Sequence, residues 1–129
     1  MTIATVMVYV DPEQQAEGQV RITWEVADKF GASLVGVSAF AVEPPFVAEG
    51  VIIRETTADD LKRMKSALAD KEQWFRSVAG LPEGRVEWRC SVGYPTAFLT
   101  NEARSADLVV IRRTREKWIN SISSIRPRR

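Results

Sequence analysis

The chain alternates between short apolar runs and longer amphipathic stretches, a pattern typical of an α/β protein. Residues 3–10 (IATVMVYV) and 33–40 (SLVGVSAF) are apolar and rich in β-branched side chains, as in strands that are buried on both faces of a parallel sheet. Residues 85–92 (RVEWRCSV) alternate between apolar and polar, which predicts a half-exposed strand at a sheet edge. Residues 107–111 (DLVVI) predict the fourth strand.

Three amphipathic helices are predicted between these strands. Asp11 and Pro12 open the first, because Asp is a favoured N-cap and Pro suits the first helical position. The third begins at Pro95. The expected inner faces are Ala16, Val20, Trp24, Ala27 and Phe30 in the first helix; Leu61, Met64, Leu68, Phe75 and Val78 in the second; and Phe98, Leu99, Ala103 and Ala106 in the third.

The boundaries of these helices carry further signals. Gly31 is expected to end the first helix, and Thr56 with Asp59 predicts a capping box at the start of the second. Residues 41–56 form a long connection with an apolar patch at 51–53. A connection of this length is usually functional or mobile. The order β-α-β-α-β-α-β predicts one parallel sheet with helices on both faces.

Composition excludes several kinds of chemistry. The 129 residues contain no histidine and a single cysteine, so no Ser-His-Asp or Cys-His arrangement is available, and no acidic cluster suggests a metal site. Cys90 lies in the alternating strand on its apolar side and is expected to be an inert core thiol. The lone cysteine favours a cytoplasmic location. The first residues lack the basic start and apolar stretch expected of a secretory signal, and no apolar run is long enough to predict a membrane-spanning helix.

The net charge of +1 conceals an asymmetry. Residues 112–129 hold seven of the 18 basic side chains and one of the 17 acidic ones, which leaves 11 basic and 16 acidic in residues 1–111 (18 − 7 and 17 − 1). We therefore expect an acidic α/β domain over 1–111 and a basic tail over 112–129. The tail is either a solvated, partly disordered end or a contact for nucleic acid or an acidic surface. Trp118 is its candidate anchor.

The residues of this domain resemble the universal stress protein (UspA-like) family. The matching pieces are Val10-Asp11 at the end of the first strand, residues 27–32 (ADKFGA), residues 34–37 (LVGV), Gly93-x-Pro95, and Ala103 followed by residues 106–111 (ADLVVI). The resemblance implies an adenine nucleotide alpha hydrolase-like fold: a three-layer parallel sheet of strand order 3-2-1-4-5. It also implies dimerisation through the fifth strand and, in many members, ATP binding at the ends of strands 1 and 4.

Six residues are candidates for that binding place, which lies where strand order reverses. By the resemblance, Asp11 approaches adenine or ribose, Tyr9 and Ala39 line the base pocket, and Ile111 offers backbone contacts. Arg112 and Arg115 occupy the positions of two glycines whose backbone amides would hold phosphate. From the residues alone, Asp11 is equally a helix cap, and Tyr9, Ala39 and Ile111 suit a core.

The family's fifth strand is also unmatched. Residues 116–125 (EKWINSISSI) lack its closing apolar run, so the sequence predicts strand order 3-2-1-4 with an apolar edge on the fourth strand. The tail, another copy of the chain in a homodimer, or a second universal stress protein domain would cover that edge.

The resulting interpretation is a universal stress protein-like regulatory or binding module in stress response, without an enzymatic activity or a cofactor. One alternative is an ATP-binding protein, with at most slow nucleotide hydrolysis, that uses the cleft between strands 1 and 4. The other is a nucleic-acid contact through the basic tail. The sequence leaves open the physiological partner and whether the chain is part of a tandem protein.

Overall fold

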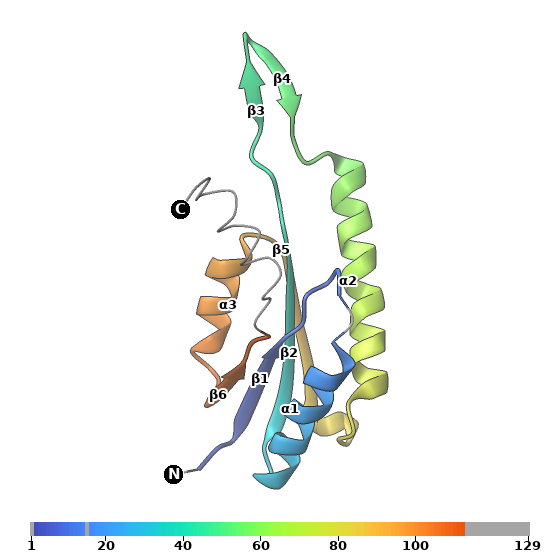
Figure 1. Cartoon of the computed structure of the whole chain (residues 1–129), viewed down its shortest axis with the longest axis vertical. Coiled ribbons are helices and arrows are strands. Elements are labelled where there is room, and N and C mark those ends of the chain that lie inside the picture. The colour runs from blue at the N-terminus through green and yellow to red at the C-terminus, as the bar shows by residue number, and fades with distance from the viewer. Residues whose placement is uncertain (1, 15, 113–129) are drawn as a thin grey trace, which may run out of the picture.

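β1 (Thr5–Tyr9) lies inside a four-stranded parallel sheet of order β5-β2-β1-β6 (Figure 1). The structure, a computed structural model, describes residues 2–14 and 16–112. The other strands of this sheet are β2 (Ser33–Ala41), β5 (Val86–Gly93) and β6 (Leu108–Val110). Numbered along the sequence as predicted, this order is 3-2-1-4. The predicted order is therefore confirmed, with the alternating strand β5 at one edge.

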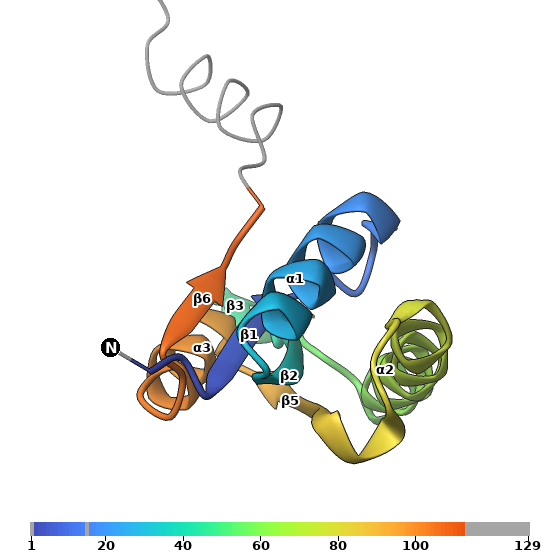
Figure 2. The same cartoon turned by 90° about the horizontal axis from the view of Figure 1, so that it is seen from below.

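The helices form the two outer layers. α1 (Glu17–Lys29) and α2 (Ala58–Val78) cover one face of the sheet, and α3 (Pro95–Ala103) covers the other (Figure 2). A short 3₁₀ turn, η1 (Glu83–Arg85), leads into β5. Alternate residues of β1 serve the two faces, since Val6 and Val8 join the core beneath α1 and α2 while Met7 joins the core beneath α3. This explains why the run 3–10 is apolar at every position.

Asp107 connects the start of β6 to the start of β1. Its Oδ2 accepts hydrogen bonds from the amides of Ala4 (2.8 Å) and Thr5 (2.9 Å). Its own amide donates to the carbonyl of Thr5 at 2.9 Å. The carboxylate therefore sets where β6 begins beside β1, in a register that pairs Val6 with Leu108.

The first helix starts later than predicted. α1 begins at Glu17, and residues 12–14 form a turn in which Asp11 Oδ1 accepts a hydrogen bond from the amide of Glu13 at 2.9 Å. The predicted role of Asp11 as the cap of this helix is therefore wrong, because its side chain caps the turn instead. Phe30 is also misassigned: it follows the end of α1 and is 51% exposed, outside the core.

The second helix begins one residue after the predicted position. Its capping box consists of Thr57 and Asp60, each side chain accepting from the other residue's amide. Leu68 and Phe75 of the predicted stripe are fully buried in the core. Lys71, which interrupts that stripe, donates to the carbonyl of Gln14 at 2.9 Å and so pins the turn after β1 to α2.

The long connection contains a hairpin that the sequence analysis did not predict. β3 (Phe46–Ala48) and β4 (Val51–Arg54) pair antiparallel and project beyond the carboxyl ends of the sheet (Figure 1). Glu49 (φ 53°) and Gly50 (φ 78°) form the turn. Two consecutive residues with positive φ match the twist of a tight hairpin, and glycine adopts the second without strain.

Two further expectations concern Cys90 and the tail. Cys90 is exposed, so the prediction of a core thiol is wrong: its position in the edge strand leaves the side chain uncovered. The basic tail beyond Arg112 lies outside the described residues, and the division of the chain at residue 111 stays a prediction. Within residues 2–14 and 16–112, no helix has the length and apolar character needed to cross a membrane.

Candidate functional site

Two cavities open at the carboxyl ends of the parallel strands. The larger, about 880 Å³, lies between the ends of β1 and β2, the base of the hairpin and the first turns of α2. The smaller, about 250 Å³, lies beside the ends of β1 and β6. The second cavity is at the point where strand order reverses, which is where open α/β sheets bind ligands.

The structure places five of the six candidate residues around these cavities. Tyr9 and Asp11 line both, Ala39 lines the larger, and Ile111 and Arg112 line the smaller. The sixth, Arg115, lies outside the described residues. These positions lie together because β1, β2 and β6 are parallel, so their carboxyl ends are on the same side of the sheet. Their role in binding stays a prediction.

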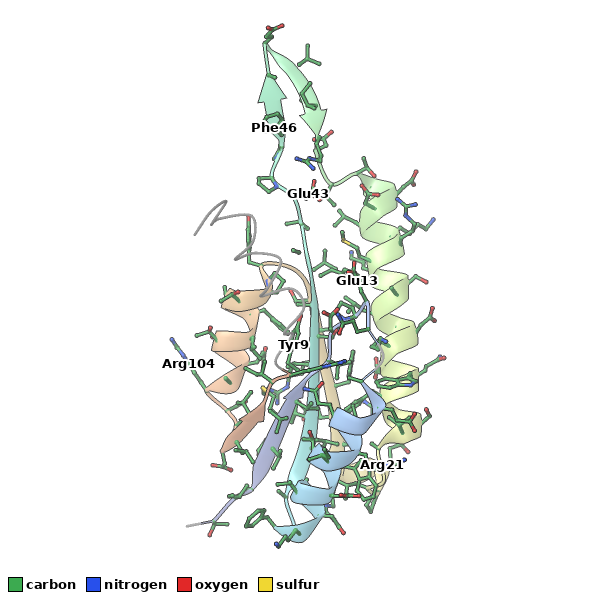
Figure 3. All side chains as sticks on the ribbon, viewed as in Figure 1. Tyr9, Glu13, Arg21, Glu43, Phe46 and Arg104 are labelled. Carbon is green, nitrogen blue, oxygen red and sulfur yellow. The ribbon has the colours of Figure 1, made fainter. Side chains whose placement is uncertain are left out.

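Tyr9, labelled in Figure 3, lines both cavities. Its hydroxyl donates a hydrogen bond to the carbonyl of Ala39 at 3.5 Å. Partial burial raises the pKa of the Tyr9 phenol above 10, and the negative charges of Asp11 and Glu13 raise this pKa further. Tyr9 is therefore a neutral donor, and its hydroxyl occupies the carbonyl of Ala39.

The turn after β1 forms the other wall of the smaller cavity. Gln14 lies in this turn and lines the cavity with Arg112, whose Nη1 donates to Gln14 Oε1 at 3.4 Å. Gln19 of α1 donates to the carbonyl of Tyr9 at 3.3 Å. The cavity is thus bordered by a guanidinium, two amide side chains and the carboxylate of Asp11. Its volume is below the roughly 300–1,000 Å³ of ordinary small-molecule pockets.

The larger cavity is lined by charged residues that the sequence analysis did not single out: Glu13, Glu43, Arg54, Glu55, Asp60 and Arg63 (Figure 3 labels Glu13 and Glu43). They come from three segments: the turn after β1, the base of the hairpin and the first turns of α2. The signal for this hairpin was present, since Glu49-Gly50 separates two apolar triplets. A tight turn between two such runs predicts a hairpin.

Both arginines of this cavity are paired with carboxylates that also line it. Arg54 Nε lies 3.4 Å from Glu43 Oε2, and Arg63 pairs with Asp60. The Asp60 pKa is lowered, first by its hydrogen bond from the Thr57 amide and then by Arg63. With Asp11, Glu13 and Glu55, the walls carry five carboxylates and two guanidiniums. No group of acidic or cysteine side chains in the described part of the chain is arranged to hold a metal ion.

The Tyr9 phenol provides a test of this geometry. The chain has two tyrosines, Tyr9 and Tyr94, so in Tyr94→Phe the phenolate ultraviolet absorbance reports Tyr9 alone and should rise only above pH 10. Because the folded pKa of Tyr9 is raised, its contribution to stability is present below about pH 10 and is lost as the pH rises through the folded value. Ionisation of this phenol at or below pH 10 would contradict the burial of Tyr9.

Comparisons with known proteins identify the fold. No protein-family model and no curated protein matches the sequence. Among solved structures, the universal stress protein UspA from Lactobacillus plantarum superposes with a TM-score of 0.65 at 15% identity, covering 86% of this chain and 77% of that one. A universal stress protein from Archaeoglobus fulgidus gives 0.53 at 22% identity, covering 86% and 76%. A universal stress protein in complex with cAMP gives 0.54 at 18%, covering 84% and 72%.

The chain is therefore an α/β domain with a parallel sheet and two cavities at the carboxyl ends of its strands, the smaller of them at the switch point. Its fold is that of the universal stress proteins, a UspA-like domain. The predicted fold class and the predicted resemblance are both confirmed at the level of fold.

Proposed function

We propose that the chain is a universal stress protein-like regulatory or binding module of the cytoplasmic stress response. It does not bind ATP in the manner of family members whose glycines expose backbone amides to the phosphates, and it has no catalytic chemistry of its own. The observation that carries this proposal is which residue follows the end of β6 and where its side chain lies. Ile111 leads directly into Arg112, whose guanidinium lies in the switch-point cavity against Gln14. A side chain stands where a phosphate-binding loop needs bare backbone amides.

Two further features support the proposal. The switch-point cavity of about 250 Å³ is small for a nucleotide, since pockets for ligands of that size usually begin at roughly 300 Å³. In addition, the Tyr9 hydroxyl already uses the Ala39 carbonyl at 3.5 Å. A purine entering from the larger cavity would have to displace that hydrogen bond.

Isothermal titration calorimetry with Mg·ATP tests the proposal. We expect no binding to the wild-type chain at submillimolar concentrations and no ATP hydrolysis above background. Arg112→Gly should increase affinity for ATP if the arginine is what blocks the amides, and Arg104→Gly should not, since Arg104 lies exposed at the end of α3 (Figure 3). A micromolar dissociation constant for the wild type that is lost in Asp11→Asn would overturn the proposal.

The second candidate function is adenine-nucleotide binding. It is favoured by the neighbour solved with cAMP and by the larger cavity, whose volume of about 880 Å³ is ample for such a ligand. The same calorimetric titration with cAMP separates the two, because cAMP needs no triphosphate loop. Binding of cAMP without binding of ATP would select this second function.

The partner proposals concern the exposed β6 edge and the basic tail. Among the described residues β6 pairs only with β1, so its other edge is open to a second copy or a second domain, and we propose a homodimer. A nucleic-acid contact would arise from the charges after residue 111. An affinity for nucleic acid that does not fall with added salt would exclude such a contact.

A further inference from the structure

The β3–β4 hairpin carries an apolar surface that the rest of the described chain leaves in solvent. Its large side chains are all 55–60% exposed: Phe46, Val47, Val51, Ile52 and Ile53. We call these five residues the hairpin surface. In a soluble domain, apolar side chains gathered in this way mark a place where another segment binds.

The hairpin is apolar on both of its faces. Val47 pairs with Ile52 and Ala48 pairs with Val51, and neighbouring pairs along a hairpin point to opposite sides. A two-stranded hairpin open to water normally keeps one polar face and is at best marginally stable alone. The sequence of this hairpin is instead that of strands covered by other parts of a protein.

The charge of the adjoining cavity indicates what kind of segment would cover the hairpin. The cavity begins at the hairpin base, with Glu43 and Arg54 in its wall. Its five carboxylates exceed its two guanidiniums, and both guanidiniums are already in ion pairs. A segment lying along the cavity and onto the hairpin surface would therefore need basic side chains near apolar ones.

Residues 113–129 have that composition. They contain six basic residues and only Glu116 as an acid, and four large apolar residues lie among them: Trp118, Ile119, Ile122 and Ile125. The spacing of these four residues is that of one face of a helix. The apolar residues of this segment are suitable partners for the uncovered hairpin surface. Its basic residues complement the excess of carboxylates in the cavity.

The segment also starts on the side of the sheet where the hairpin lies. β2 and β6 are both parallel to β1, so the chain leaves β6 at the carboxyl ends of the strands, from which β2 continues toward the hairpin. Arg112 lines the smaller cavity with Tyr9 and Asp11, which also line the larger one. The 17 residues after Arg112 (129 − 112) can extend about 56 Å. That is well beyond the radius of gyration of about 14 Å expected for such a domain.

We propose that residues 113–129 bind the hairpin surface of the same molecule, with their basic side chains along the acidic cavity at its base. The contact buries the exposed apolar residues of the hairpin. It is independent of the proposed function, because it requires no nucleotide.

Hydrogen–deuterium exchange on the full chain tests this proposal. We expect amides of residues 46–54 to exchange at least tenfold more slowly in the wild type than in Ile119→Asp/Ile122→Asp, while amides of β1 and β2 exchange equally in both. The reciprocal variant Val47→Asp/Ile52→Asp should speed exchange in residues 113–129. Ile22→Asp is the matched control, since Ile22 is 61% exposed on α1, and it should leave the hairpin unchanged.

Two results would overturn the proposal. Equal exchange of the hairpin in the wild type and in Ile119→Asp/Ile122→Asp would show that the segment does not cover it. Protection that disappears on tenfold dilution, together with a dimer mass by light scattering, would assign the contact to a second copy rather than to the same molecule.

Discussion

Phe75→Ala is expected to lower the free energy of unfolding by about 3–5 kcal/mol, the largest effect of any single substitution considered for this domain. Phe75 is fully buried on α2, and its ring centroid lies 5.2 Å from that of Trp88 in β5. Truncation removes the contact between the second helix and the edge strand and leaves a cavity that the surrounding sheet is unable to close. The loss is a large part of the roughly 5–15 kcal/mol available to a domain of this kind.

Urea unfolding followed by circular dichroism measures this effect. Phe30→Ala is the matched control, because it is the same chemical change at a side chain that is 51% exposed. It should change stability by less than about 0.5 kcal/mol. Equal losses in the two variants would mean that Phe30 belongs to the core, as the sequence pattern suggested, and would contradict the structure.

Gly36→Ala should destabilise the domain by about 1–3 kcal/mol although it adds only a methyl group. A Cβ at this buried position of β2 would lie 2.7 Å from Phe75 Cζ and 2.8 Å from Trp88 Cε3. These distances are far below van der Waals contact, and both rings are packed, so either the helix or the edge strand has to move. Gly36 is what allows the two aromatic side chains to lie directly on the sheet.

Gly18→Ala gives the matched control with the opposite sign. Gly18 lies in the first turn of α1, and a Cβ there would meet no atom within 4 Å. Alanine should therefore stabilise the helix by up to about 1 kcal/mol through its higher propensity. Thermal unfolding of both variants checks the pair. A stabilising Gly36→Ala would show that the rings give way freely and that the packing at β2 is loose.

Most of the sheet could be predicted from the sequence, but the details of the segments between its strands could not. The runs at 3–10 and 33–40 are apolar at nearly every position because each strand is covered on both faces, so their strand character and burial could be predicted directly. The strand order also depended on the resemblance of residues 106–111 to a known family. The signals that misled were local ones. Asp11-Pro12 suits a helix start and a turn equally. The hydrogen bond from Lys71 of α2 to the carbonyl of Gln14 adds a tertiary contact that fixes the turn against α2.

The candidate site divides in the same way. Tyr9, Asp11, Ala39, Ile111 and Arg112 were candidates because of the family resemblance, and they lie together because parallel strands have their carboxyl ends on one side of the sheet. The charged wall of the larger cavity could not be found in this way. Glu13, Glu43 and Asp60 are far apart along the chain, and only the hairpin and the first turn of α2 bring them to one cavity.

By itself, then, the sequence determined the layered α/β architecture, because hydrophobic periodicity reflects burial face by face. It also determined that Arg112 comes shortly after β6, at a position where the family resemblance implies a glycine. The tertiary structure decided the outcome where local signals were ambiguous: Asp11 caps a turn, Phe30 and Cys90 are exposed, and β3 and β4 form a projecting hairpin. The physical reason is that a local pattern specifies which conformations a segment can adopt, whereas contacts between distant segments select one of them.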